Sequence, residues 1–124
     1  MSIFLYGGLA SIAFGVASLA YYTFSGANLL TAREAKNMIK SGKVKHIIDV
    51  RTETEWKLGH YDGAIHIPRI EISKKRLDSN NIKKKDTILV YCNTGQRARM
   101  ASEKMMELGY VNVYYIAGHY STIQ

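Results

Sequence analysis

The chain has 124 residues, which is enough for one ordinary domain and leaves no room for a second large one. Its net charge of +7 lies entirely after residue 32, because no charged side chain precedes Arg33. A single cysteine excludes an internal disulfide framework, so nothing in the sequence requires an oxidising compartment. Basic and aromatic residues are not interleaved, so we expect no nucleic-acid partner. The basic runs 74–76 and 83–85 are interpreted as solvated surface, with contact to anionic lipid as the alternative.

The first segment, residues 3–24, is uncharged and rich in apolar residues. About 22 residues at about 1.5 Å each make a helix of about 33 Å, long enough to cross a bilayer. We therefore expect one transmembrane helix, with residues 1–28 as a membrane anchor. A cleavable signal peptide is the alternative, because Ser18–Ala20 resembles a cleavage site, but no Lys or Arg precedes the apolar run.

The residues in and around this span predict its orientation and contacts. The basic residues that follow the span most closely are Arg33, Lys36, Lys40, Lys43 and Lys45. The positive-inside rule then places the C-terminal domain in the cytoplasm, as part of a single-pass membrane protein. Gly7, Ser11 and Gly15 recur every four residues on one helix face, a pattern that permits helix-mediated self-association.

The remaining residues, 29–124, show the helix and strand signals of one further domain. Residues 28–32 are expected to form a short connection. A capping box of Thr31 and Glu34 then predicts a helix that ends at Gly42. Residues 46–50 predict a buried strand. A second capping box, of Thr52 and Glu55, opens a short helix that ends at Gly59.

The later elements continue this alternation. We expect an extended segment at 64–67, a short amphipathic helix at 69–77, a strand at 87–91, a helix at 96–108 and a strand at 111–116. Strands that alternate with helices imply parallel crossovers. The predicted fold is therefore a three-layer α/β domain with a central parallel sheet flanked by helices.

Cys92 lies where parallel sheets bind ligands, directly after the strand 87–91 and before the helix that begins at Gln96. Gly95 allows the intervening loop to turn tightly with its N–H groups facing inward. Together with the helix N-terminus, these donors form a cradle that stabilises a thiolate. Arg97 adds a permanent charge and a donor fork suited to an oxyanion such as thiosulfate. This arrangement favours a reactive thiol over the alternative, a buried cysteine acting as a small hydrophobe.

At these positions the chain resembles the rhodanese-like sulfurtransferases. The resemblance is carried by residues 48–51 with Glu55 and Trp56, by 59–68, by 90–97 and by 108–110. Taken in this order, the segments are specific and span nearly all of residues 29–124. The resemblance implies a rhodanese domain with Cys92 as the nucleophile and a persulfide formed on it. It also implies that the loop binds the transferred sulfur or the donor anion through Asn93, Thr94, Gly95, Gln96 and Arg97.

Four residues separate Cys92 from Arg97, a spacing that favours sulfur over phosphate. The related dual-specificity cell-cycle phosphatases place the arginine one residue later, in a wider loop. Arsenate reductases of this fold usually need further cysteines, and this chain has none. Ala98, Asp62 and residues 117–120 depart from the usual family pattern. These departures leave donor specificity open and predict a more open C-terminal edge of the site.

Four further polar residues are interpreted as structural support. Asp49, Arg51 and Glu55 are expected to form a charge network below the strand ends, not to act as catalysts. His60 follows a helix-ending glycine and is expected to be hydrogen bonded, not to serve as a general base. The other histidines show no metal-ligand spacing with Cys92, so we expect no metal and no cofactor.

The predicted function is ping-pong transfer of sulfane sulfur. The Cys92 thiolate takes sulfur from thiosulfate or a low-molecular-weight persulfide, and a thiophilic acceptor then removes it. Because the chain has no second cysteine, the accepting thiol must come from outside. The alternatives are a membrane-tethered binding module on the same fold and a phosphatase-like enzyme.

Overall fold

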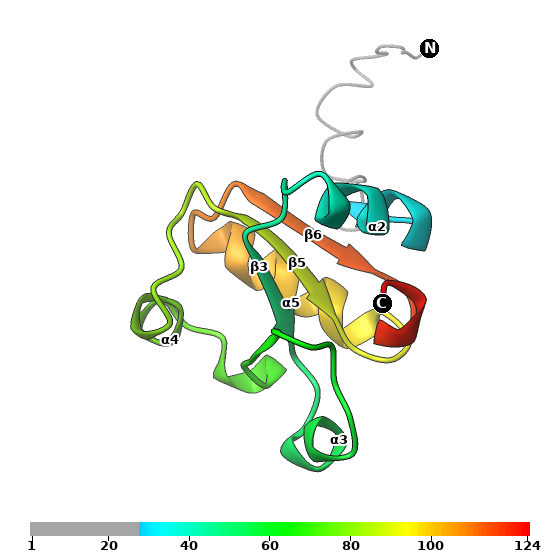
Figure 1. Ribbon diagram of the computed structural model, residues 1–124. Helices are drawn as coiled ribbons and strands as arrows, with labels where there is room; N and C mark the ends of the chain where they lie inside the picture. Colours follow the sequence, from blue (N-terminus) through cyan, green and yellow to red (C-terminus); the bar gives the residue numbers. More distant parts are fainter. Residues whose placement is uncertain (1–27) are drawn as a thin grey trace, which may run out of the picture.

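The computed structural model describes residues 28–124, in which five parallel strands form one sheet in the order β2-β6-β5-β3-β4 (Figure 1). The strands are β2 (Leu29–Leu30), β3 (His46–Asp49), β4 (Ile65–His66), β5 (Thr87–Tyr91) and β6 (Asn112–Ile116). The α-helices are α2 (Ala32–Lys40), α3 (Glu53–Lys57), α4 (Lys74–Ser79) and α5 (Gln96–Glu107). Two short 3-10 helices complete the fold, η1 (Arg69–Glu71) and η2 (Tyr120–Thr122).

Helices cover both faces of the sheet, as the alternation of strands and helices predicted (Figure 1). The central strand β5 sends alternate side chains to opposite faces, because the side-chain period of a strand is two. One face packs against α4 and α5, through Ile88, Val90, Cys92, Leu77, Ala98, Ala101 and Met105. The other packs against α2 and the C-terminal segment, through Leu89, Tyr91, Ala35 and Ile123. The three-layer α/β architecture is therefore confirmed for the described residues.

The register of the sheet brings the carboxyl ends of three strands together. Asp49 is paired with His66 on one side and with Tyr91 on the other. Beyond the strand ends, the Val50 N–H donates to Tyr91 O at 3.1 Å and the Ile67 N–H donates to Asp49 O at 2.9 Å. The residues that follow β3, β4 and β5 therefore meet at one edge of the sheet, where parallel sheets bind their ligands.

Both predicted capping boxes are present. The Thr31 hydroxyl accepts from the Glu34 N–H at 3.0 Å, and the Glu34 carboxylate accepts from the Thr31 N–H at 2.8 Å. Thr52 and Glu55 exchange the same two bonds at the start of α3, at 3.3 Å and 2.9 Å. The second capping box also orients the side chain of Glu55, a residue of the candidate site described below.

The expectation that residues 28–32 form only a connection is wrong. Leu29 and Leu30 form the edge strand β2, which pairs with Tyr115 and Ile116 of β6. The Asn28 side chain supports this pairing by donating to Val113 O at 3.1 Å. A strand of two residues shows no alternation of its own, so its pairing depends on β6 and not on local pattern.

The single helix expected at 69–77 is also wrong, because this region divides into η1 and α4. Ser73 has an extended backbone, with φ −154° and ψ 160°, and its hydroxyl accepts from the Arg76 N–H at 3.0 Å. Ser73 is thus the N-cap of a new helix, a position that serine favours. Ile70, expected on the apolar face of one helix, is 81% exposed.

No helix within residues 28–124 combines the length and the apolar composition needed to cross a bilayer. The transmembrane helix predicted at residues 3–24, and the self-association of that helix, lie outside the described residues. Both stay predictions.

Candidate active site

The loop between β5 and α5 encloses the sulfur of Cys92. The side chain of Cys92 is fully buried, and its Sγ accepts N–H groups from Gly95 at 3.1 Å and from Ala98 at 3.3 Å. Both donors come from the tight turn that opens α5, where backbone N–H groups have no partner within the helix. Two dipoles directed at one sulfur stabilise negative charge on it.

Gly95 is the residue that permits this turn. Its φ is +107°, a left-handed conformation that glycine adopts without strain. A Cβ built at this position would lie 2.7 Å from Ala117 Cα and 2.9 Å from Ala117 Cβ. The loop therefore lies directly against the segment that follows β6, and no larger residue fits between them.

Glu55, from the neighbouring helix α3, occupies the rim of the loop. Its two carboxylate oxygens accept from Arg97 Nη1 at 2.7 Å and Nη2 at 3.0 Å, and one of them also accepts from Asn93 Nδ2 at 2.9 Å. The hydrogen bonds from Arg97 hold the pKa of Glu55 well below its usual value, at about 2. The same bonds raise the pKa of Arg97. The Glu55 carboxylate thus occupies the two N–H donors of the Arg97 guanidinium, which are the same donors that a substrate anion would use.

A buried network supports the loop from below. Arg51 donates to the Asp49 carboxylate through Nη2 at 2.7 Å, and the Tyr91 hydroxyl donates to the same carboxylate at 2.6 Å. Arg51 also reaches Asn93 Oδ1 at 3.4 Å. Burial, together with the hydrogen bond to Asp49, raises the pKa of Tyr91. The network therefore connects the end of β3 with the last residue of β5 and with the first residue after Cys92.

The C-terminal segment covers this network, whereas a more open edge was expected. The ring of Tyr120, from η2, lies 5.2 Å from Arg51 Cζ and 5.8 Å from the Tyr91 ring. Ile123 is 3% exposed and holds the segment against the sheet. The residues that depart from the family pattern at 117–120 therefore still pack over one side of the site.

His60 lies away from the cysteine loop. Its Nδ1 is hydrogen bonded to Trp56 O at 2.8 Å, and its ring stacks on the Trp56 ring. His66 Nε2 is hydrogen bonded to Arg51 O at 2.8 Å. Within residues 28–124, no three His, Cys, Asp or Glu side chains gather as metal ligands would.

The structure thus brings together most, but not all, of the predicted site residues. The sulfur of Cys92 accepts the Gly95 N–H, and the rim of the loop carries Asn93 and Arg97, both of which donate to Glu55. Thr94 and Gln96 lie on the exposed side of the loop. Two contributors were missed by sequence reasoning, the Tyr91 hydroxyl and the Ala98 N–H. The second could have been inferred, because it belongs to the first turn of a predicted helix.

A parallel α/β domain with one cysteine under two N–H donors at the end of its central strand defines a thiol-based group-transfer site. Residues 31–124 match the family described as "Rhodanese-like domain". The chain therefore belongs to the rhodanese-like domain family, and this membership supports a general role in sulfur transfer.

Individual relatives agree with this assignment. The thiosulfate sulfurtransferase PspE of Escherichia coli is 39% identical over 74 residues, which cover 60% of this chain and 70% of the relative. A solved structure of the human single-domain sulfurtransferase TSTD1 superposes with a TM-score of 0.66 at 25% identity, over 78% of this chain and 95% of that one. A rhodanese with anions from E. coli superposes with a TM-score of 0.52 at 38% identity, over 59% of this chain and 84% of that one.

Proposed function

We propose that this protein is a rhodanese-type sulfurtransferase in which Cys92 carries the transferred sulfur. The observation that supports the proposal most directly is the pair of N–H groups from Gly95 and Ala98 on the buried Sγ. Two N–H donors directed at one sulfur stabilise negative charge on it, and the negatively charged sulfur is the nucleophile in sulfur transfer. The curated relative named thiosulfate sulfurtransferase points to the same chemistry.

In the first half-reaction, the Cys92 thiolate attacks the outer sulfur of thiosulfate. A new S–S bond forms at Sγ, the S–S bond of thiosulfate breaks, and its electron pair leaves with sulfite. The product is a Cys92 persulfide, whose charge lies within the reach of the loop N–H groups. Because Glu55 already binds the Arg97 fork, a donor anion has to compete with a carboxylate of this chain for that fork.

In the second half-reaction, an external thiolate attacks the outer sulfur of the Cys92 persulfide. The S–S bond to Sγ breaks and the electron pair returns to Cys92, so that no oxidant or reductant is consumed. The acceptor must be external because the chain has no second cysteine. Low-molecular-weight persulfides are proposed as alternative donors, since they present the same outer sulfur.

Mass spectrometry of the intact protein after thiosulfate treatment tests the proposal. We expect one added sulfur, lost on treatment with cyanide, and no such adduct in Cys92→Ser. Absence of the adduct, or equal thiosulfate:cyanide turnover in the Cys92→Ser variant, would favour a binding module instead. Hydrolysis of a small aryl phosphate that depends on Cys92 would favour the phosphatase-like alternative.

We further propose that residues 3–24 anchor the protein in a membrane with the domain on the cytoplasmic side. The support is the uncharged length of this segment and the basic residues that follow it. A reducing compartment suits an unpaired thiol, because an accepting thiol is present there in its reduced form.

A further inference from the structure

The loops that precede β3, β5 and β6 meet at one edge of the sheet, which we call the amino edge (Figure 1). The Lys45 N–H donates to Thr87 O at 2.9 Å, and the Val111 N–H donates to Lys84 O at 3.1 Å. Because all strands of the sheet are parallel, the amino edge lies opposite the carboxyl edge, which carries Cys92 after β5. The amino edge is therefore a surface separate from the candidate active site.

Five exposed lysines lie at the amino edge: Lys43, Lys45, Lys83, Lys84 and Lys85. The acidic residue of these loops is Asp86, whose side chain is only 12% exposed. Its carboxylate lies 2.8 Å from His46 Nε2 and accepts from the Lys83 N–H at 2.8 Å. Among residues 28–124, none of the five lysines forms an ion pair. Most of the positive charge at this edge is therefore not neutralised by the domain itself.

An exposed aliphatic side chain lies beside these lysines. Val111 is 66% exposed, and its loop contacts Lys84 through the backbone hydrogen bond to Lys84 O. The Lys84 side chain follows the same loop, because a Cβ built at Gly109 would lie 3.1 Å from Lys84 Nζ. Lysines around an exposed aliphatic residue suit a lipid surface, where ammonium groups meet headgroup phosphates and the aliphatic group enters the apolar boundary.

The path of the chain directs the amino edge toward the predicted anchor. Leu29 pairs with Tyr115, three residues beyond the start of β6, so the amino edge lies about 10 Å back along the sheet. Asn28 donates to Val113 O, which lies closer to that edge, so the chain enters β2 from the side of the amino edge. The predicted span ends at residue 24, and residues 25–28 reach at most about 14 Å. A bilayer that holds the anchor is thus within reach of the five lysines.

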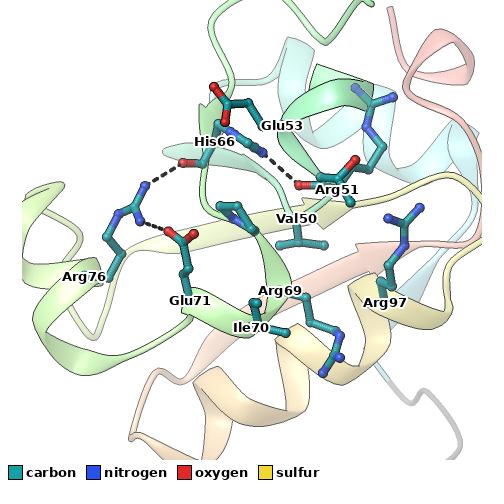
Figure 2. A pocket seen from close by; sticks show the side chains of 11 residues that line it. Val50, Arg51, Glu53, His66, Arg69, Ile70, Glu71, Arg76 and Arg97 are labelled. Atoms are coloured by element: carbon teal, nitrogen blue, oxygen red, sulfur yellow. Dashed lines mark hydrogen bonds and ion pairs between the residues drawn. The ribbon is translucent and has the colours of Figure 1, made fainter. Parts of the chain in front are cut away.

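The other basic run, residues 74–76, lacks these properties. Lys74 pairs with Asp78 at 2.8 Å. Arg76 pairs with Glu71 and donates to His66 O, as Figure 2 shows. Of the two basic runs, the one at 83–85 therefore offers unpaired charge at the edge that the anchor can bring to a membrane.

We propose that the amino edge docks on the anionic headgroups of the membrane that holds the anchor. The five lysines bind lipid phosphates, and Val111 enters the boundary of the apolar layer. In this orientation the carboxyl edge faces away from the bilayer, so the Cys92 loop lies on the aqueous side. The inference rests on the proposed anchor and is independent of the sulfur chemistry.

The experiment measures whether anionic lipid shields position 111 in the full 124-residue chain. Val111→Cys in a Cys92→Ser background carries one thiol, which is labelled with an uncharged polyethylene-glycol maleimide. The protein is reconstituted into phosphatidylcholine vesicles with or without phosphatidylglycerol. A lysine near an anionic surface contributes about fivefold in affinity, so we expect the labelling rate to fall roughly tenfold or more on the anionic vesicles. The rate should recover in 1 M salt, where the Debye length is about 3 Å.

Leu58→Cys in the same background is the matched control. Leu58 is 85% exposed and lines a pocket with Asn93, at the carboxyl edge. The length of β5 places it about 17 Å from the amino edge, beyond a Debye length of about 8 Å. Its labelling rate should therefore stay within about a factor of two between the two kinds of vesicle.

A pair of triple variants tests the lysines. Replacing all three lysines of the run 83–85 with glutamine should remove most of the protection at position 111. The charge-matched variant, which should keep the protection, replaces three exposed lysines on α3, α4 and α5: Lys57→Gln, Lys75→Gln and Lys104→Gln.

Two results would overturn the inference and leave the anchor standing. One is a chain that floats with the vesicles but is labelled at position 111 at equal rates on both lipids. The other is an equal loss of protection in the two triple variants, because charge in general would then attract the domain. A wild-type chain that does not float with vesicles would remove the anchor and this inference together.

Discussion

At the scale of single residues, the ion pair between Glu55 and Arg97 determines which donor groups are available to an incoming anion. An arginine that faces a loop cysteine is positioned to bind an oxyanion. In this protein, however, both Nη atoms of Arg97 donate to the Glu55 carboxylate. That carboxylate also accepts from Asn93 and from Thr52. Charge at the rim is therefore balanced before any donor arrives, which favours donors able to displace a well-bonded glutamate.

We predict that Glu55→Gln lowers the KM for thiosulfate roughly threefold to tenfold, since a neutral amide neither repels the dianion nor pairs as strongly with Arg97. The pKa of Glu55 is held at about 2, below its ordinary value, so the carboxylate loses its charge only as the pH falls toward that value. The KM ratio of variant to wild type should therefore be constant from about pH 5 to about pH 8. Steady-state kinetics with thiosulfate and cyanide across this range give the measurement.

Glu53→Gln is the control for this prediction, because Glu53 lies on the same helix and pairs only with the exposed Lys57 among the described residues. It removes an equal charge without freeing Arg97. If Glu55→Gln instead raised the KM and lowered kcat together, Glu55 would be needed to hold Arg97 in place, and competition with the donor would not be its main effect.

At the scale of elements, the turn between β5 and α5 depends on its contact with the segment after β6. We predict that Gly95→Ala abolishes persulfide formation and lowers the free energy of unfolding by more than the roughly 1–2 kcal/mol of a left-handed alanine. The added Cβ would lie 2.7 Å from Ala117 Cα, so the loop has to shift away from Ala117 in addition to holding an alanine at positive φ. Denaturant unfolding and the thiosulfate adduct measure the two effects separately.

Gly63→Ala separates strain from steric overlap. Gly63 also has a positive φ, +89°, but a Cβ there meets nothing within 4 Å. We expect this control to lose only the conformational contribution and to form the persulfide normally. Equal losses of stability in the two variants would mean that the contact with Ala117 relaxes at little cost.

Elements with strong local signals were predictable, and those that depend on distant partners were not. The two capping boxes, β5 and α5 follow from residue types at fixed spacing. By contrast, β2 forms only because β6 is beside it, and Ser73 divides a region whose apolar spacing favoured one helix. A local sequence pattern predicts neither the pairing of β2 with β6 nor the start of a new helix at Ser73.

The same distinction holds for the site. The position of Cys92 at a strand end and before a glycine turn is a local property of the chain, so the sulfur cradle was predictable. The pairing of Glu55 with Arg97 joins residues 42 positions apart, one on α3 and one in the first turn of α5, and depends on the tertiary fold. Tyr91 was overlooked because its hydroxyl acts on the face of the sheet opposite the sulfur.

At the scale of the whole molecule, charge and apolar character are segregated along the chain. Every Lys, Arg, Asp and Glu lies after residue 32, and the family match begins at residue 31. The charged residues and Cys92 therefore all lie in the domain. The residues before it are uncharged and largely apolar, and we interpret them as an anchor. Sulfur transfer would then take place within about the height of one small domain from a membrane surface.

We predict that the chain remains in the membrane fraction of the cells that express it after washing at high salt and alkaline pH. The double variant Val16→Asp, Leu19→Asp should move to the soluble fraction, because an acidic residue costs roughly 2.5–3.5 kcal/mol at the centre of a transmembrane helix on insertion scales, and two such residues lie within the predicted span. The apolar control Val16→Leu, Leu19→Val keeps the charge and should stay in the membrane. Mass spectrometry of the membrane-bound protein distinguishes a retained segment from a cleaved one. Recovery of the wild-type chain in the soluble fraction, at its full mass, would contradict the anchor and leave the sulfur chemistry of Cys92 untouched.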